Sequence, residues 1–598
     1  MAVSAIGIAA SVAGSYAATF ATSAVAGFIT QGLVSTIVAG ALSGLIPDDA
    51  QNGDRVAEQA SALLNKAGNN NPLPVVYGYR KIGGTRVFME VSGSDNEFLH
   101  VVIAMSEGEI NSFENVYIND IISTDSRFNG VLNVYTHTGA DNQTADSNLV
   151  ASLPNWTSAH RLRGTSYVYV KLKFDVDAFP QGLPTITADL KGTKVYDPRP
   201  SGGLTAWSDN PALCVRNYLT NSRYGRGIAT SLIDDDSFKV AANYCDENVN
   251  IGGATVKRYT CNGIVNTSQG SIGLLKELLT SCKGFLVFTG GKYKLVIDKV
   301  ESAGFTFNED NITGAWTVSL GSKNTQFNRI RANFINKNKQ WQPDIAVVES
   351  SALRTLDNGE LLEKTTTLPY TTDIDRAKMI TTININQSRQ KISCEFTATI
   401  EGLKAEVGDV VFIKHSTVGW QYLNASAGKK FRIIKMALQN NDEVKVTAVE
   451  YADGSYDFGT IQVADTAPNT NLPDVTTTKI PVNLLASEQL FVTNTGQGVQ
   501  VRANLSWTAP TDAFAQFYEV EYAEGSGAFQ FVTSTRATSA EVNNLKAGTF
   551  SFRVRTVNTI GVRSAYITLT QSLAGLTTPP VTIQNFSVNA IDGSAYLQ

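Results

Sequence analysis

The stretch YDPRPSGGLTAWSDNPALCVRNYLTNSRYGRG, residues Tyr196–Gly227, decides how the middle of the chain folds. Its first residue ends a strand, and the segment PRPSGG predicts a turn because proline and glycine interrupt regular structure. Asp209 or Asn210 then caps a helix with Pro211 in its first turn, where the missing N–H of proline costs no hydrogen bond. The run Arg223–Gly227 ends the helix. The stretch holds no motif for catalysis.

A compact α/β module continues from this helix. Asp234, Asp235 and Asp236 predict the start of a second helix over SFKVAANYCDE, since acidic side chains stabilise helix N-termini. A metal site is the alternative interpretation of these three acids. The segments RYTCNGIV, SIGLLKELLTSCKG and FLVFTGGKYKLVID predict a strand, a helix and a hairpin. The hairpin turn Phe288–Lys292 lacks the spacing of a phosphate-binding loop.

Strand-like segments flank this module. Before it, the sequence predicts a short helix over Arg55–Ala67 and a hairpin around Gly83–Gly84, where apolar and polar residues alternate. After about residue 310, runs such as FNRIRANFI, KISCEFTATI and EVKVTAVEY predict strands again. Gly408–Asp409 before VVFIKH is typical of a small barrel. These patterns predict a mainly β, multidomain fold in which an α/β insertion lies between barrel-like parts.

Length and charge limit the classes of function. A chain of 598 residues is too long for one core, and 43% hydrophobic against 17% charged residues is typical of folded domains. The formal net charge of −5 does not favour a basic surface that grips nucleic acid phosphates. We therefore expect DNA to pass such a protein without binding to it.

Five cysteines form an odd and sparse set, which argues against a secreted scaffold built on disulfides. None of their spacings matches the C-x-x-C pairs of zinc or iron–sulfur sites. We expect buried small side chains, with a disulfide inside residues 214–282 as the first alternative and a metal site as the second. The five are Cys214, Cys245, Cys261, Cys282 and Cys394.

The four histidines give little basis for catalysis, because none belongs to a metal or nucleophile motif. His100 lies in the apolar strand FLHVVIAMSEGEI and is expected to be a core residue with satisfied hydrogen bonds. The others are His137, His160 and His415. We predict no enzyme, no catalytic residue, no metal ligand and no cofactor.

Residues 1–47 contain no Asp, Glu, Lys or Arg and predict hydrophobic helices. Small residues at helical spacing, including Gly40–Gly44, let helices approach closely and favour a plug packed inside an assembly. A membrane anchor is an alternative, although it lacks flanking basic residues that set orientation. A segment that is stored in a particle and later inserted into a membrane is the other alternative.

Ordered motifs run through most of the chain. LKGTKVYDPR, AWSDNPALCVRNYLTNSRYGRG, FKVAANYCDENV and RYTCNGIV follow one another from Leu190 to Val265, and VVYGYRKIGGTRVF and FLHVVIAMSEGEI precede them. Together they resemble the lambda-type family of phage tail tip attachment protein J. The resemblance runs with gaps from about Val75 to Asp457. The uncharged segment 1–47 departs from the lambda-type members of this family.

A second resemblance covers the end of the chain. VRANLSWTAPTDAFAQFYEVEYA and NNLKAGTFSFRVRTVNTIGVRS are similar to a fibronectin type III sandwich. Trp507 matches its buried aromatic residue, and Tyr518, Val520 and Tyr522 alternate in the next strand. Phe550 stands where the corner tyrosine is usual, so that hydroxyl is missing. Residues 576–598 resemble the opening strands of a second such domain, from which we infer that the chain is truncated.

The two resemblances imply a division into domains of a tail hub. We expect an apolar helical segment at 1–47, the start of a hub barrel at 48–110, a β-rich inserted hub domain at 111–197, an α/β hub domain at 198–308, a hub β-barrel at 309–465, a linker at 466–483, a fibronectin type III domain at 484–575 and the start of a second at 576–598.

The tail tip family implies a structural virion protein at the distal end of a siphophage tail. The expected form is a homotrimer that contacts the distal tail protein, other tail tip proteins and the tape measure protein in the lumen. It would support attachment to a host outer-surface receptor through its C-terminal region, and it would open for genome ejection while DNA passes without specific binding. Membrane contact would come from residues 1–47. A membrane-anchored surface adhesin is the alternative function.

Overall fold

The computed structural model describes residues 52–575, with short internal gaps, and the backbone of 588–591 and 594–597. The gaps are 69–70, 177, 180–181, 252, 268–270, 315, 322–324, 425–426, 440, 460–473 and 493–498. The apolar segment predicted over 1–47 lies outside the described residues, as do the first part of the predicted linker and most of 576–598. Among the helices that are described, none has the length and apolar character needed to cross a bilayer.

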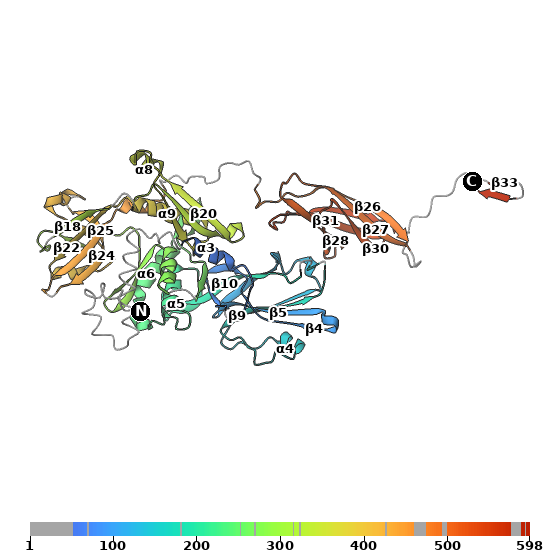
Figure 1. The fold of residues 1–598 in the computed structure, drawn as a ribbon, viewed down its shortest axis with the longest axis horizontal. Helices are drawn as coiled ribbons and strands as arrows, with labels where there is room; N and C mark the ends of the chain where they lie inside the picture. Colours follow the sequence, from blue (N-terminus) through green and yellow to red (C-terminus); the bar gives the residue numbers. More distant parts are fainter. Residues whose placement is uncertain are drawn as a thin grey trace. The chain divides into compact units, whose positions relative to one another are not determined.

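The chain folds into two compact units. The first contains Met1–Asn119, Val134–Lys171 and Thr185–Pro468, and the second contains Asp120–Asn133, Leu172–Pro184 and Asn469–Gln598. Sheets and helices alternate in the first unit, whereas a sandwich of strands dominates the second (Figure 1). The predicted mainly β, multidomain fold class is confirmed.

Two sheets open the first unit. One sheet has the order β1-β4-β5-β9-β8, and the other contains β11, β10 and β6, with β3 also paired to β10. Their bounds are β1 (Lys66–Ala67), β3 (Tyr79–Ile82), β4 (Thr85–Ser92), β5 (Phe98–Glu107), β6 (Ile110–Ile118), β8 (Leu132–His137), β9 (Thr165–Lys173), β10 (Ile186–Asp197) and β11 (Leu204–Trp207). In the first sheet, the short β1 runs parallel to β4, and β4 runs antiparallel to β5.

The hairpin predicted around Gly83–Gly84 is wrong. β3 pairs with β10 while β4 pairs with β5, so the chain crosses from one sheet to the other at the two glycines. A Cβ atom on Gly83 would lie 2.6 Å from the carbonyl oxygen of Leu63, and Gly84 has a φ of +66°. The glycines therefore allow a close backbone crossing. The preceding helix α3 spans Asn52–Ser61 and is shorter than predicted.

The α/β module follows β11 and contains three helices. Its elements are α5 (Pro211–Thr220), α6 (Asp235–Asp246), β12 (Asn248–Ile251), β13 (Ala254–Lys257), β14 (Gly263–Asn266), α7 (Ser271–Thr280), β15 (Gly284–Thr289) and β16 (Lys292–Ile297). β15 and β16 form the predicted hairpin, whose turn glycines Gly290 and Gly291 have φ of +58° and +76°. β14 is shorter than the predicted strand and pairs with β2 (Pro74–Tyr77).

One hydrophobic core joins this module to elements far along the chain. It contains Leu213, Phe238 and Leu275 of the helices together with Phe334 and Ile380. Phe334 belongs to the three-stranded sheet β20-β19-β21, and Ile380 belongs to α9, which packs against that sheet. The bounds are β19 (Arg329–Asn336), β20 (Gln342–Glu349), α8 (Ser351–Leu356), β21 (Glu363–Leu368) and α9 (Ile374–Gln387). Packing thus fixes the module against α9 and its sheet.

The first unit ends in a six-stranded sheet with its own core. The strand order is β17-β23-β24-β25-β22-β18, and Phe307, Phe396, Trp420 and Phe431 are among the core residues. The strands predicted over 309–465 therefore divide between two sheets: β19, β20 and β21 form the sheet described above, and the others join β17 in this sheet around an aromatic cluster. Its bounds are β17 (Phe305–Phe307), β18 (Thr317–Leu320), β22 (Ile392–Ala398), β23 (Val410–Ile413), β24 (Lys429–Leu438) and β25 (Val444–Glu450).

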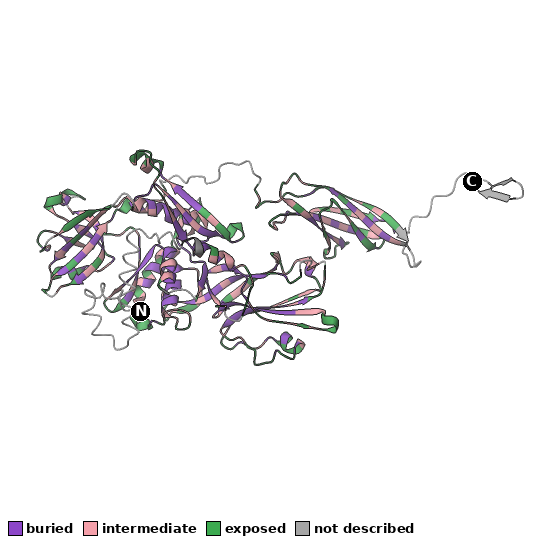
Figure 2. Ribbon diagram, viewed as in Figure 1, coloured by how far each residue is buried: buried purple, intermediate pink, exposed green. Residues whose placement is uncertain are grey.

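The second unit contains a sandwich of two antiparallel sheets, β26-β27-β30 and β29-β28-β31-β32. Trp507 packs edge-on against Tyr518 with ring centroids 5.3 Å apart, and both side chains are buried with Val520 and Phe550, as the fibronectin pattern predicts. Figure 2 shows buried and exposed residues alternating along these strands. The bounds are β26 (Val482–Val492), β27 (Val499–Thr508), β28 (Ala515–Glu524), β29 (Gln530–Thr535), β30 (Ser539–Leu545), β31 (Gly548–Asn558) and β32 (Ile567–Leu573).

Candidate functional site

Helix caps position the α/β module. The Asn210 side-chain oxygen accepts a hydrogen bond from Ala212 N at 3.0 Å, and its amide donates to the Ala242 carbonyl at 2.9 Å. Of the two predicted caps, Asn210 therefore caps α5. Asp209 instead accepts a hydrogen bond from Lys257 Nζ at 2.9 Å.

The three acids before α6 have separate partners. Asp234 caps the helix by accepting a hydrogen bond from Ser237 N at 3.1 Å. Asp235 pairs with Arg216 at 2.7 Å, and Asp236 pairs with Lys239 at 3.0 Å. The predicted capping role is confirmed. Across the part of the chain that is described, no three His, Cys, Asp or Glu residues are grouped to hold a metal.

The four histidines lie apart and each has its own contacts. His100 is fully buried between Ser92 Oγ at 2.7 Å and the Tyr169 hydroxyl at 2.8 Å, so the predicted satisfied core residue is confirmed. Burial lowers the pKa of His100. His137 Nε2 lies 2.8 Å from the Asp146 carboxylate. The other two stack on tryptophan rings, His160 on Trp156 and His415 on Trp316.

All five cysteines are free and buried, which confirms the first interpretation of them. Burial raises the pKa values of the Cys214, Cys245 and Cys394 thiols, the last to about 12. A thiol is nucleophilic only as the thiolate, so these side chains are poor nucleophiles and poor metal ligands in the folded chain.

Arg432 of β24 is the centre of a buried polar cluster, with 1% of its side chain exposed. Its Nη1 lies 3.0 Å from the Glu301 carboxylate and donates to the Gly408 carbonyl at 2.6 Å, while Nη2 lies 3.3 Å from Asp298. The Tyr456 hydroxyl donates to the same Asp298 carboxylate. Burial disfavours the charged guanidinium, but Asp298 and Glu301 keep the pKa of Arg432 above its ordinary value.

Lys283 completes this cluster from the end of α7. Its Nζ donates to Asn384 Oδ1 at 2.6 Å and to Gln387 Oε1 at 3.0 Å, both on α9. Gln387 Nε2 in turn donates to Asp298 Oδ2 at 2.5 Å. Burial lowers the pKa of Lys283, while Asp298 at 3.9 Å opposes that change. We call this set the polar joint: Lys283, Asp298, Glu301, Asn384, Gln387, Arg432 and Tyr456.

The polar joint connects the α/β module, α9 and the six-stranded sheet. Its two cations and two carboxylates balance, and a buried charge that loses its partner costs several kcal/mol, about 3 to 5 in comparable cases. Only one arrangement of the three parts therefore satisfies the joint. Sequence patterns missed it because its members come from segments that have no local relation to each other.

A cavity of about 40 Å³ between α3 and α7 is too small for a substrate. Arg55, Glu58 and Glu277 are among its lining residues, and Arg55 Nε lies 3.0 Å from Glu277. Burial raises the pKa of Glu277 to about 7, although Arg55 opposes the increase. This cavity can hold a few water molecules at most.

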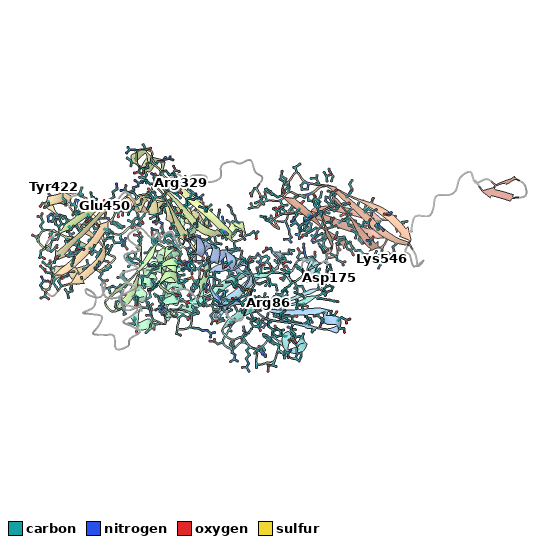
Figure 3. All side chains as sticks on the ribbon, in the orientation of Figure 1. Arg86, Asp175, Arg329, Tyr422, Glu450 and Lys546 are labelled. Atoms are coloured by element: carbon teal, nitrogen blue, oxygen red, sulfur yellow. The ribbon has the colours of Figure 1, made fainter. Side chains whose placement is uncertain are left out.

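An open hollow of about 420 Å³ lies over β18, β22 and β25. It is lined by two carboxylates, Glu395 and Glu443, and by Lys445. Lys445 lowers the pKa of Glu395, and Glu443 accepts a hydrogen bond from Thr313 Oγ1 at 2.8 Å. The general acid that cleaves sugars needs a raised pKa, so Glu395 does not suit that role. Tyr422, labelled in Figure 3, follows β23 of the same sheet and is 78% exposed.

Comparisons with known proteins agree with the two resemblances. A family described as "Putative phage tail protein" matches residues 272–430, and the fibronectin type III domain family matches residues 495–570. The baseplate hub protein pb3 of Escherichia phage T5 is 22% identical over 84% of this chain and 60% of its own length. The tip attachment protein J of Escherichia phage SECphi27 is 23% identical over 67% of this chain and 41% of its own length.

The chain is similar to siphophage tail tip and baseplate hub proteins along most of its length. The predicted family, the fibronectin type III domain and the location in the virion at the tail tip are thereby confirmed. The chain spans less than two thirds of the length of these two relatives. A chain of the native gene transfer agent particle aligns to 73% of it with 14% identity and a TM-score of 0.47.

Proposed function

We propose that this protein is a trimeric hub at the tip of a phage tail, where it closes the distal end and opens for genome ejection. Its similarity to a baseplate hub protein and to a tip attachment protein supports this function. In such an assembly it would contact the distal tail protein, other tail tip proteins and the tape measure protein. Attachment to a host receptor would be supported by the C-terminal region.

The polar joint is the structural observation that best supports a mechanical role for the protein. A cap on a conduit must keep its shape, and the joint links the α/β module, α9 and the six-stranded sheet through charges that are largely buried and depend on exact geometry. Hydrophobic packing alone tolerates sliding more readily than a buried ion network does. The joint therefore suits a region, residues 283–456, that acts through rigid geometry.

Arg432→Met tests this role, because it removes the guanidinium and leaves Asp298 and Glu301 without their main cation. We expect virions to assemble with the variant poorly or with misshapen tips. Lys445→Met is the matched control, since it removes an ion pair with Glu395 in which both side chains are almost half exposed. Equal assembly of the two variants would argue against the role of the joint.

We infer that DNA passes the hub without specific contacts and that the hub is not an enzyme. The net charge of −5 and the small or poorly suited hollows support both statements. A gel-shift measurement at physiological salt should show no complex with duplex DNA. A turnover screen against peptidoglycan and polysaccharide should release no product.

Electron cryo-microscopy of purified virions tests the hub directly. The expected result is three copies around the tail axis at the distal end. One copy placed off the axis would contradict the trimer, and absence of the chain from the tip would contradict the whole proposal.

A further inference from the structure

The outer face of the β29-β28-β31-β32 sheet carries two buried carboxylates. Tyr518 and Val520 of β28 point into the sandwich core, so the alternating Glu519 and Glu521 belong to the opposite face, where solvent is expected. Instead, Glu519 is 0% exposed and Glu521 is 1% exposed. Other groups of the protein must therefore cover and pair with these carboxylates.

Arginines of the sandwich account for part of this burial. Strand register places Arg555 opposite Glu519 and Arg553 opposite Glu521. Arg555 Nε lies 2.7 Å from Glu519, and Arg563 Nε lies 3.4 Å from the same carboxylate. The sheet thus presents fixed rows of alternating charge rather than a uniform surface.

The covering segment is the turn Asp125–Phe128, which belongs to the same compact unit. Arg127 is 7% exposed and forms an ion pair with Glu519. Asp125 Oδ2 lies 2.9 Å from Arg555 Nη2, and Ser126 Oγ donates to Glu521 at 2.9 Å. Each of three consecutive residues of the turn therefore contacts a charged residue of the sheet.

The turn is shaped for this contact before it meets the sheet. Asp125 caps its single helical turn by accepting a hydrogen bond from Arg127 N at 3.2 Å. The Asp125 carboxylate also holds the Arg127 guanidinium at 3.1 Å, which fixes the planar donor group in one direction. Arg127 then lies over the ring of Phe531 at 5.1 Å.

A second segment supports the turn. Phe128 stacks on Phe179 with ring centroids 5.8 Å apart, and Lys173 N donates to the Val131 carbonyl at 2.8 Å. The segment that contains Lys173 and Phe179 thus supports the turn, and the turn contacts the sheet.

We propose that this sheet face is an arginine-binding surface whose built-in ligand is the turn Asp125–Phe128. The sandwich would then be attached at two places along the chain: covalently before β26, and non-covalently through a turn that lies between β6 and β8 in sequence. This second attachment goes beyond the hub function and provides a route by which load on the sandwich reaches β6 and β8. The surface is specific for the chemistry of its ligand. It requires an arginine that pairs with Glu519, as Arg127 does, and a nearby aspartate that pairs with Arg555, as Asp125 does.

Hydrogen exchange of the full chain tests the proposal. In Arg127→Ala, amides of residues 120–133 should exchange about tenfold faster or more, because a buried ion pair has lost one partner. Arg127→Lys should give a smaller increase, since an ammonium group cannot reproduce the forked contact. Arg502→Ala is the matched control: it removes the 2.6 Å pair with Glu541 on the other sheet and should leave 120–133 unchanged.

Two results would overturn the proposal. Unchanged exchange of 120–133 in Arg127→Ala would show that the arginine does not hold the turn. Equal loss of protection in β28 and β31 would show that Arg127 is part of the sandwich core instead of a ligand for its surface. Retained protection of those strands together with faster exchange of 120–133 is the supporting result.

Discussion

Lys283 Nζ donates a 2.6 Å hydrogen bond to Asn384 Oδ1 across 101 positions of sequence. The two residues come from the end of α7 and from α9, and Asp298 lies near the same ammonium group. This contact makes the position of α9 depend on a charged side chain that is almost wholly buried. The polar joint should therefore control how α9 opens.

Lys283→Met should destabilise α9 by about 3 kcal/mol, because it leaves the Asn384 and Gln387 oxygens and the Asp298 carboxylate without a buried cation. Native-state hydrogen exchange of the α9 amides measures this free energy of opening. Lys445→Met, which removes a solvent-exposed pair, should change it by less than about 1 kcal/mol. A similar effect of both variants would mean that the joint adds nothing beyond packing.

Thiol reagents should not modify the folded chain. Burial raises the pKa values of Cys214, Cys245 and Cys394, so very little thiolate exists at neutral or mildly alkaline pH. A disulfide-exchange reagent at pH 8 should react only as fast as the chain opens, and denaturant should release all five thiols. Rapid labelling of the native chain would contradict this prediction.

Local patterns were readable from the sequence, and long-range pairings were not. The caps at Asn210 and Asp234 depend on the next three residues, so side-chain type and order are enough to predict them. The segments on either side of Gly83–Gly84 show the alternation of apolar and polar residues that is typical of a hairpin. In the structure, however, β3 pairs with β10 and β4 pairs with β5. Strand pairing is set by tertiary packing, which no local window contains.

Buried ion pairs between distant residues are even harder to predict from local sequence than strand pairing. Glu519 occupies a position that alternation assigns to solvent. Its burial depends in part on Arg127, which lies 392 residues earlier in the chain (519 − 127). The sequence around a charged strand residue does not indicate whether its side chain is buried in an ion pair or exposed to solvent. Family resemblance, carried by several ordered motifs, supplied the function that single motifs did not.

Asn210→Ala should destabilise the start of α5 by about 2 kcal/mol. It removes the cap of the helix and also leaves the Ala242 carbonyl without its donor in a fully buried site. Exchange rates of the α5 and α6 amides measure the change. Asp209→Ala is the neighbouring control and should cost less than about 1 kcal/mol, because the Lys257 side chain with which it pairs is 43% exposed.

Glu277 should make the contact between α3 and α7 weaker as pH rises. Its folded pKa of about 7 lies above the ordinary value of 4.5, so the folded state holds the proton more tightly than the unfolded state. The stabilisation is complete below pH 4.5 and is lost as pH rises through 7, with a total change of up to about 3 kcal/mol. Arg55 at 3.0 Å limits the loss without removing it.

Glu277→Gln should flatten this profile and make α3 more stable than in the parent chain at pH 8. Hydrogen exchange of α3 at pH 5 and pH 8, corrected for the intrinsic rates, measures both effects. Glu395→Gln is a suitable control, since Lys445 lowers the pKa of that exposed carboxyl group and its effect should have the opposite sign and a small size. If α3 opens equally at both pH values in the parent chain, the buried carboxyl group is not the cause of any pH dependence, and the pair with Arg55 keeps Glu277 ionised throughout.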